Sequence, residues 1–122
     1  METIKHMLLQ HNKKMESFNF NFINEERMLE LNHNYLDHDT LTDVITFDYS
    51  TNRAVSGECY ICLDRAHENA QKHSQSLENE LLRLVFHAVL HCLGFPDKTE
   101  EEKRIMREQE DHFLQLFHVK HK

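Results

Sequence analysis

The sequence predicts a single domain of the α/β or α+β class, with a small mixed β-sheet packed against helices, over residues 1–122. Short segments with period-two apolar patterning are interleaved with longer segments of helical periodicity, which is typical of this class. There is no internal repeat or low-complexity stretch, and the chain holds only 2 glycines and 1 proline. No linker is therefore expected, and the length suits one hydrophobic core.

The first third of the sequence predicts a helix, a strand and a second helix. Apolar side chains recur at helical spacing over residues 4–11 and indicate a short amphipathic helix. Phenylalanines alternate with polar residues from 18 to 22, which is the pattern of a half-buried strand. Asn24 can cap the next helix, whose apolar positions run from Met28 to Tyr35.

Two further strands and a polar helix are expected in the middle of the chain. Residues 44–47 and 60–63 predict strands, and the short polar link at 50–55 suits an antiparallel pair. The other links between strands contain helices, so parallel neighbours are expected there. Asp64 is expected to cap a helix that ends near Lys72.

The most apolar helical segment covers residues 77–93. Its apolar side chains are spread around most of the circumference, which predicts a buried helix at the centre of the domain. Gly94 suits the position after the helix end, and Pro96 prevents continuation. Thr99 and Glu102 then form a capping box for the last helix.

Charge and cysteine content narrow the functional classes. The formal net charge of −7 argues against an extensive basic surface for nucleic acid. Three cysteines agree with a reducing compartment, and residues 1–14 lack the apolar core of a signal peptide, so a cytoplasmic location is expected. No apolar run approaches the roughly 18 to 20 residues that span a bilayer. No membrane partner is expected.

The central helix carries the residues that point most directly to chemistry. His87 and His91 are four positions apart, so both imidazoles lie on one helix face and can reach a single ion. Gly94 releases the chain, and the following turn can bring Asp97 back over that face. Two nitrogens and one carboxylate oxygen with an open fourth position are typical of a catalytic site for one Zn²⁺ ion. The spacing H-x-x-x-H-x-x-G-x-x-D matches a metzincin-like zinc helix with Asp as its last ligand.

Other interpretations apply to the same segment. The chain holds 11 histidines, so a pair at helical spacing can arise by chance. Glu100 and Glu101 are the alternative third ligands if Asp97 is not one. Ala88 stands where metalloproteases need a glutamate base, so peptidase chemistry is not expected. No catalytic side chain is identified beyond a zinc-bound water, and Lys98 is a candidate only by its proximity to Asp97.

The cysteines do not predict a second metal site. Cys59 and Cys62 fall on a predicted strand, where residues three apart point to opposite faces, and no other Cys pair completes a zinc ribbon. Cys92 points away from the ligand face of the helix. All three are expected to be core or sheet residues.

Three blocks of the sequence resemble the YbeY endoribonuclease family. Residues 87–97 resemble the family's zinc motif H-G-x-L-H-L-x-G-Y-D-H, and residues 31–47 resemble its block L-N-x-x-Y-R-x-K-D-x-P-T-D-V-L-S-F. Residues 57–62 resemble its strand G-D-I-x-I-S, and Met106 with Glu110 resembles its final helix.

The resemblance implies a zinc-dependent endoribonuclease specific for single-stranded RNA, acting on an rRNA precursor together with the ribosomal subunit or ribosomal proteins. It assigns the ligands to His87, His91 and Asp97, where Asp97 replaces a family His. Leu36 replaces a family Arg connected with RNA handling, which weakens the transfer of phosphate-binding chemistry. The alternative function is a ribosome assembly factor with a mainly structural zinc and little catalysis.

Overall fold

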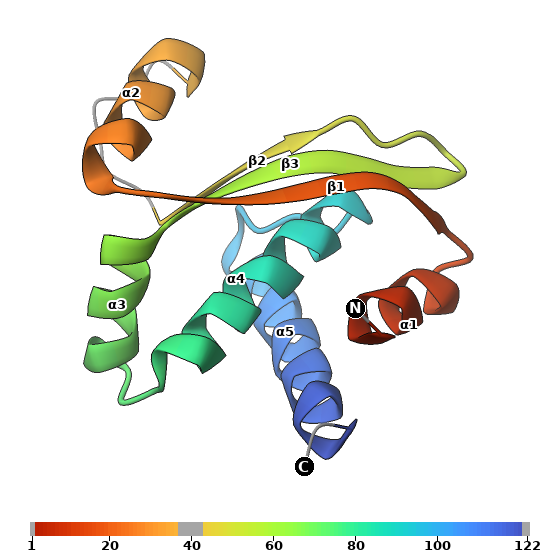
Figure 1. The fold of residues 1–122 in the computed structure, drawn as a ribbon. Helices are drawn as coiled ribbons and strands as arrows, with labels where there is room; N and C mark the ends of the chain where they lie inside the picture. The colour runs from red at the N-terminus through yellow and green to blue at the C-terminus, as the bar shows by residue number, and fades with distance from the viewer. Residues whose placement is uncertain (1, 37–42, 121–122) are drawn as a thin grey trace.

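The structure is a computed structural model that describes residues 2–36 and 43–120. In chain order its elements are α1 (Glu2–Gln10), β1 (Lys14–Ile23), α2 (Glu25–Leu36), β2 (Val44–Asp48), β3 (Ala54–Cys62), α3 (Leu63–Lys72), α4 (Leu77–Cys92) and α5 (Glu100–Lys120). Figure 1 shows α2 on one side of the sheet and α1, α4 and α5 on the other. The prediction of a small mixed sheet packed with helices is confirmed.

The sheet has the strand order β1-β3-β2, which places the last strand in the centre. β2 and β3 are antiparallel, as the short polar link between them predicts. β1 runs parallel to β3, and α2 lies in the chain between them, as expected for parallel neighbours. None of the described helices is long and apolar enough to cross a membrane.

Alternate residues of β3 face the two sides of the sheet. Cys59 packs with Leu84 and Ala88 of α4, whereas Cys62 packs with Met28 of α2. The two thiols therefore lie on opposite faces, as the strand assignment predicts, and both are fully buried. Burial raises the pKa of the Cys59 thiol to about 12, so this residue behaves as a small apolar side chain.

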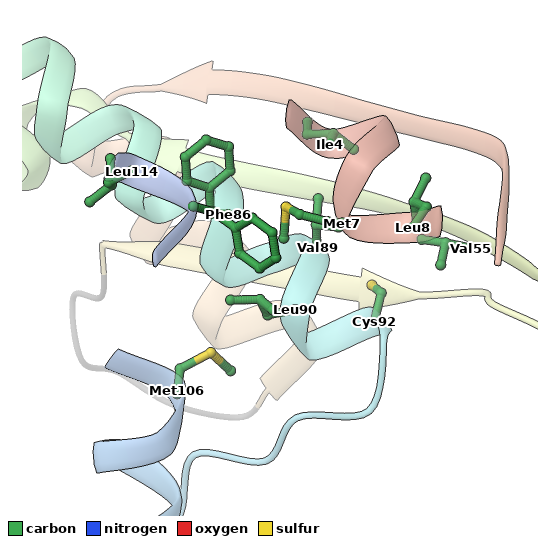
Figure 2. Packing of buried hydrophobic residues seen from close by; sticks show 11 residues of the cluster. Ile4, Met7, Leu8, Val55, Phe86, Val89, Leu90, Cys92, Met106 and Leu114 are labelled. Carbon is green, nitrogen blue, oxygen red and sulfur yellow. The ribbon is translucent and has the colours of Figure 1, made fainter. Parts of the chain in front are cut away.

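The largest hydrophobic cluster lies where α4 meets α1, α5 and the sheet, as Figure 2 shows. Its buried members are Ile4, Met7, Leu8, Val55, Phe86, Val89, Leu90, Cys92, Met106, Phe113 and Leu114. Burial of a side chain such as Phe86 stabilises the fold by about 1.5–3 kcal/mol. This packing on several sides confirms the prediction that residues 77–93 form the central helix.

The ends of the last two helices follow local sequence signals. At the end of α4, the amide of Gly94 donates to the carbonyl of His91 at 3.0 Å, and the amide of Phe95 donates to that of Leu90 at 3.1 Å. This Schellman pattern needs the left-handed φ of +102° that Gly94 adopts. At the start of α5, Thr99 and Glu102 exchange two hydrogen bonds of 3.0 Å, which confirms the capping box.

Several sequence predictions differ from the structure in detail. Leu63 begins α3 instead of ending β3, and Cys62 is the N-cap residue without a side-chain hydrogen bond. The carboxylate of Asp64 does not cap α3 but accepts from the backbone amide of Glu25, at 3.2 Å, at the start of α2. Phe22 is 51% exposed, whereas Phe18 and Phe20 of the same strand pack against the core.

We predict that Gly57→Ala destabilises the protein by about 1–3 kcal/mol, because overpacking forces neighbouring atoms apart. A Cβ atom on Gly57 would lie 2.6 Å from the carbonyl oxygen of Phe47 and 3.5 Å from Sγ of Cys92. The first contact is with backbone, which cannot swing aside. Urea unfolding of both proteins measures the difference.

The matched comparison is Gly94→Ala, where a Cβ atom would meet nothing within 4 Å. That variant is expected to lose about 1–2 kcal/mol from the left-handed φ alone. Gly94→Asn should recover part of the lost stability. At position 57 no other amino acid should recover it, because each has a Cβ atom. Equal stability of Gly57→Ala and wild type would contradict the close approach of the Phe47 carbonyl of β2 to Gly57.

Candidate functional site

The side chain of His87 lies between two carboxylates. Its Nδ1 is 2.7 Å from Oε2 of Glu110 on α5, and its Nε2 is 3.2 Å from Oδ2 of Asp97 in the α4–α5 link. The Glu110 side chain is 6% exposed and the Asp97 side chain 40%. Both ring nitrogens therefore face carboxylate oxygens, and the shorter contact is on the buried side.

A cation on α4 completes this network. Arg83, one turn before His87, donates from one guanidinium nitrogen to Oε1 of Glu110 at 3.0 Å and from the other to Oδ1 of Asp111 at 2.6 Å. The two oxygens of Glu110 are thus divided between Arg83 and His87. A buried carboxylate needs such partners, because an unpaired charge is costly away from water.

The electrostatic surroundings of His87 act in two directions. Burial alone would lower the pKa of the imidazole, because the charged form loses hydration. The hydrogen bond and charge of Glu110, together with the charges of Asp97 and Asp43, outweigh burial and raise this pKa above its ordinary value. The site therefore favours a positive charge at the ring, whether a proton or a metal ion supplies it.

These residues line a groove with a volume of about 500 Å³ between α3, α4 and α5. Beyond His87, Asp97 and Glu110, the groove is lined by Asp43, Val44, Asn69, His73, Glu80, Arg83, Leu84, Lys103, Met106 and Arg107. Lys103 and Arg107 are exposed on α5, one helical turn apart. The groove thus has a carboxylate-held imidazole at its floor and two cations along one wall.

The structure brings together two of the three predicted zinc ligands. His87 and Asp97 are in contact, whereas His91 lies one turn further along α4 and is exposed. Within residues 2–36 and 43–120, no group of three His, Cys, Asp or Glu side chains is close enough to hold an ion. The alternative ligands, Glu100 and Glu101, are exposed in the first turn of α5.

The contact between His87 and Asp97 nevertheless fits a metal site. Two donors on one tetrahedral zinc, with bonds of about 2.0–2.2 Å, lie about 3.3–3.6 Å apart. The observed separation of Nε2 and Oδ2 is 3.2 Å. Zinc-binding imidazoles also donate their second N–H to a carboxylate, and Oε2 of Glu110 lies 2.7 Å from Nδ1 of His87, where it can accept such a hydrogen bond. The donor types and the position of Glu110 therefore suit the ion.

Three other predicted positions are placed as follows. Ala88 is fully buried against Leu84 in the core and supplies no base to the groove. Lys98 is exposed, and its backbone amide donates to Glu102 at 3.1 Å as part of the α5 cap. The side chain of Leu36 and residues 37–42 lie outside the described part of the chain.

Sequence reasoning did not assign a role to Arg83 or Glu110. A signal exists for Arg83, which stands at i−4 from His87 on the same helix face. Glu110 lies 23 positions after His87, on another helix, so no local spacing connects them. Lys103 and Arg107 have helical spacing, but only the packing of α5 on α4 directs them to the groove.

Comparison with known proteins gives consistent matches. A family model described as Endoribonuclease YbeY matches residues 1–118. A Flavobacterium psychrophilum protein named Endoribonuclease YbeY is 43% identical over 117 residues, which cover 96% of this chain and 84% of that protein. A protein of the same name from Christiangramia forsetii is 38% identical and covers 95% of this chain and 81% of its own length.

The fold also has a solved counterpart. The solution structure of TM1509 from Thermotoga maritima matches with a TM-score of 0.65 over 93% of this chain and 75% of that protein. The two sequences are 24% identical, so this likeness concerns the fold alone.

We predict that Glu80→Gln raises the melting temperature by several degrees at pH 7. Glu80 is 6% exposed, and burial raises the pKa of its carboxyl; the charges of Asp43 and Glu110 add to this, while Arg83 and His73 oppose it. A raised pKa means that ionisation of Glu80 destabilises the folded state as the pH rises above the ordinary Glu pKa of about 4.3. Thermal unfolding followed by circular dichroism measures the effect.

The difference in melting temperature should shrink as the pH falls and vanish below about pH 3, where Glu80 is protonated in folded and unfolded chains alike. Glu78→Gln is the matched control, since Glu78 is exposed in the same first turn of α4. Glu78→Gln measures the loss of a favourable helix-dipole interaction at a position where burial does not contribute. A lower melting temperature for Glu80→Gln than for Glu78→Gln at pH 7 would contradict the assignment.

Proposed function

Because this chain belongs to the endoribonuclease YbeY family, we propose that it hydrolyses single-stranded RNA with one zinc ion held by His87, His91 and Asp97. The predicted family and the predicted class of enzyme are both confirmed by that membership. One observation carries the proposal for the site, namely the approach of Nε2 of His87 to Oδ2 of Asp97 at 3.2 Å on the floor of the groove.

Each proposed ligand has a defined part. His87 would present Nε2, since Nδ1 is engaged by Glu110, and Asp97 would present a carboxylate oxygen. His91 would supply the second nitrogen from the next turn of α4. When bound, zinc would polarise a phosphoryl oxygen and activate water for hydrolysis. Ala88 stands where metalloproteases have a glutamate base, and its methyl group cannot accept a proton. This favours RNA over peptide as the substrate.

The groove also offers side chains for the RNA backbone. Lys103 and Arg107 stand four residues apart and project from one face of α5, so they can bind neighbouring phosphates. Arg83 lines the same groove, but two carboxylates of α5 hold its guanidinium. The ion pair of Lys103 with Glu100 is longer, at 3.8 Å, and joins two exposed side chains. We therefore assign phosphate binding to Lys103 and Arg107, in a chain that has Leu36 where the family has Arg.

The biological setting is proposed from the family and the composition. The substrate would be an rRNA precursor, and ribosomal subunits or proteins would be the partners. Their positive groups would aid binding, because a net charge of −7 weakens attraction to free RNA. We place the activity in the cytoplasm, where the three buried thiols stay reduced.

We predict that the purified protein holds about one zinc per chain and cleaves single-stranded RNA but no peptide. His87→Ala, His91→Ala and Asp97→Ala should each lose most of the metal and reduce cleavage to the level of chelator-treated protein. Metal analysis and gel-based cleavage of a labelled RNA, free and within pre-ribosomal particles, measure both properties.

His67→Ala is the matched control, because His67 is an exposed histidine of α3 that does not line the groove. It should keep both metal and activity. Equal cleavage by wild type, His91→Ala and chelator-treated protein would reveal a contaminating nuclease. Full zinc occupancy without cleavage, even on particles, would favour the assembly-factor function instead.

We predict that Lys103→Gln with Arg107→Gln raises the KM for RNA about tenfold and lowers the salt dependence of binding, since each lost phosphate contact removes released counterions. Zinc content should not change. Arg104→Gln is the matched control, because Arg104 lies between the two on α5 but pairs with Glu101 and Glu108 outside the groove. Equal effects of the two substitutions would contradict the assignment of the groove wall.

A further inference from the structure

We propose that Glu110 is a positioning residue that fixes the tautomer of His87, and that Arg83 determines which hydrogen-bonding group residue 110 can present to the imidazole. The arrangement is a chain from Arg83 through Glu110 to His87, with contacts of 3.0 Å and 2.7 Å. The consequence for zinc binding rests on the proposed function, whereas the tautomer itself is a property of the metal-free protein.

Two carboxylates compete for the hydrogen of a neutral His87. A carboxylate only accepts, so Glu110 favours the hydrogen on Nδ1 and Asp97 favours it on Nε2. Glu110 is closer, at 2.7 Å against 3.2 Å, and its side chain is 6% exposed against 40%. A shorter hydrogen bond to a buried charge is the stronger one, because water does not screen it. The ring therefore keeps its hydrogen on Nδ1 and leaves the lone pair of Nε2 facing Asp97 and the groove.

Arg83 makes this choice depend on the chemistry of residue 110. A guanidinium carries only donors, so the atom of residue 110 that faces Arg83 must be an acceptor. A carboxylate has two acceptors and satisfies both neighbours. An amide has one acceptor and one donor group. In Glu110→Gln the amide oxygen would therefore face Arg83, and the NH₂ group would face Nδ1 of His87.

Glu110→Gln, although nearly isosteric, should therefore move the hydrogen of the His87 ring. An NH₂ donor opposite Nδ1 requires a lone pair there, so the hydrogen moves to Nε2, where Asp97 accepts it. The nitrogen proposed to bind zinc is then blocked. If Arg83 is also replaced by Leu, the amide is free to turn its oxygen toward His87 and the hydrogen returns to Nδ1. A second substitution next to the first would thus restore the wild-type tautomer.

The test is nitrogen NMR of the histidine rings in the chelator-treated chain, at a pH raised until the ring nitrogen shifts show a neutral His87, because its carboxylate neighbours raise its pKa above the ordinary value. His87→Gln identifies the resonance of His87. The expected tautomers are Nδ1–H for wild type, Nε2–H for Glu110→Gln, and Nδ1–H for the double variant with Arg83→Leu. Asp111→Asn is the matched control, because Asp111 also binds Arg83 but is not in contact with His87.

Zinc titration supplies the second measurement, with Zn²⁺ alone as the probe. Loss of a carboxylate behind a metal-binding His weakens affinity by about 10–100-fold, and the double variant should recover several-fold of it. An Nε2–H tautomer in wild type overturns the proposal without any variant. An unchanged tautomer in Glu110→Gln, or identical behaviour of single and double variants, also overturns it. Absence of zinc binding to wild type would instead refute the proposed function and leave the tautomer result standing.

Discussion

The packing of α5 along α4 determines where polar chemistry can occur in this molecule. α4 contacts the sheet, α3 and α5, and its middle residues are buried except on the side that borders the groove. Polar side chains on such a helix need partners from a neighbouring element. α5 supplies them as Glu110 and Asp111, which bind Arg83 and His87. The same contacts that neutralise these side chains also orient them toward the groove.

Signals that act within a few residues allowed much of the fold to be predicted. The limits of α4, the left-handed Gly94 and the reciprocal cap of Thr99 with Glu102 all depend on near neighbours in the chain. The role of Asp64 could not be predicted in this way. Its carboxylate binds the amide of Glu25, 39 positions earlier, and only the parallel pairing of β1 with β3 brings the two helix starts together.

The same distinction applies to the site. Helical spacing selected His87, and the helix end at Gly94 selected Asp97, and these two side chains are in contact. Spacing places His91 on the same side of α4, but it does not reveal that the histidine is exposed, because exposure depends on where α5 crosses. The role of Glu110 was found only through tertiary structure, since its partners lie 23 and 27 positions away on another helix.

The parallel pairing of β1 with β3 has a further consequence, for the order in which the molecule folds. That pairing joins residues such as Lys14 and Ala54, which are 40 positions apart. The helical hairpin of α4 and α5, by contrast, is closed by a short link and contains Arg83, His87, Asp97 and Glu110 within one continuous segment. Contacts between residues close in sequence form faster than distant strand pairings. The network around His87 is therefore expected to assemble before β1 pairs with β3.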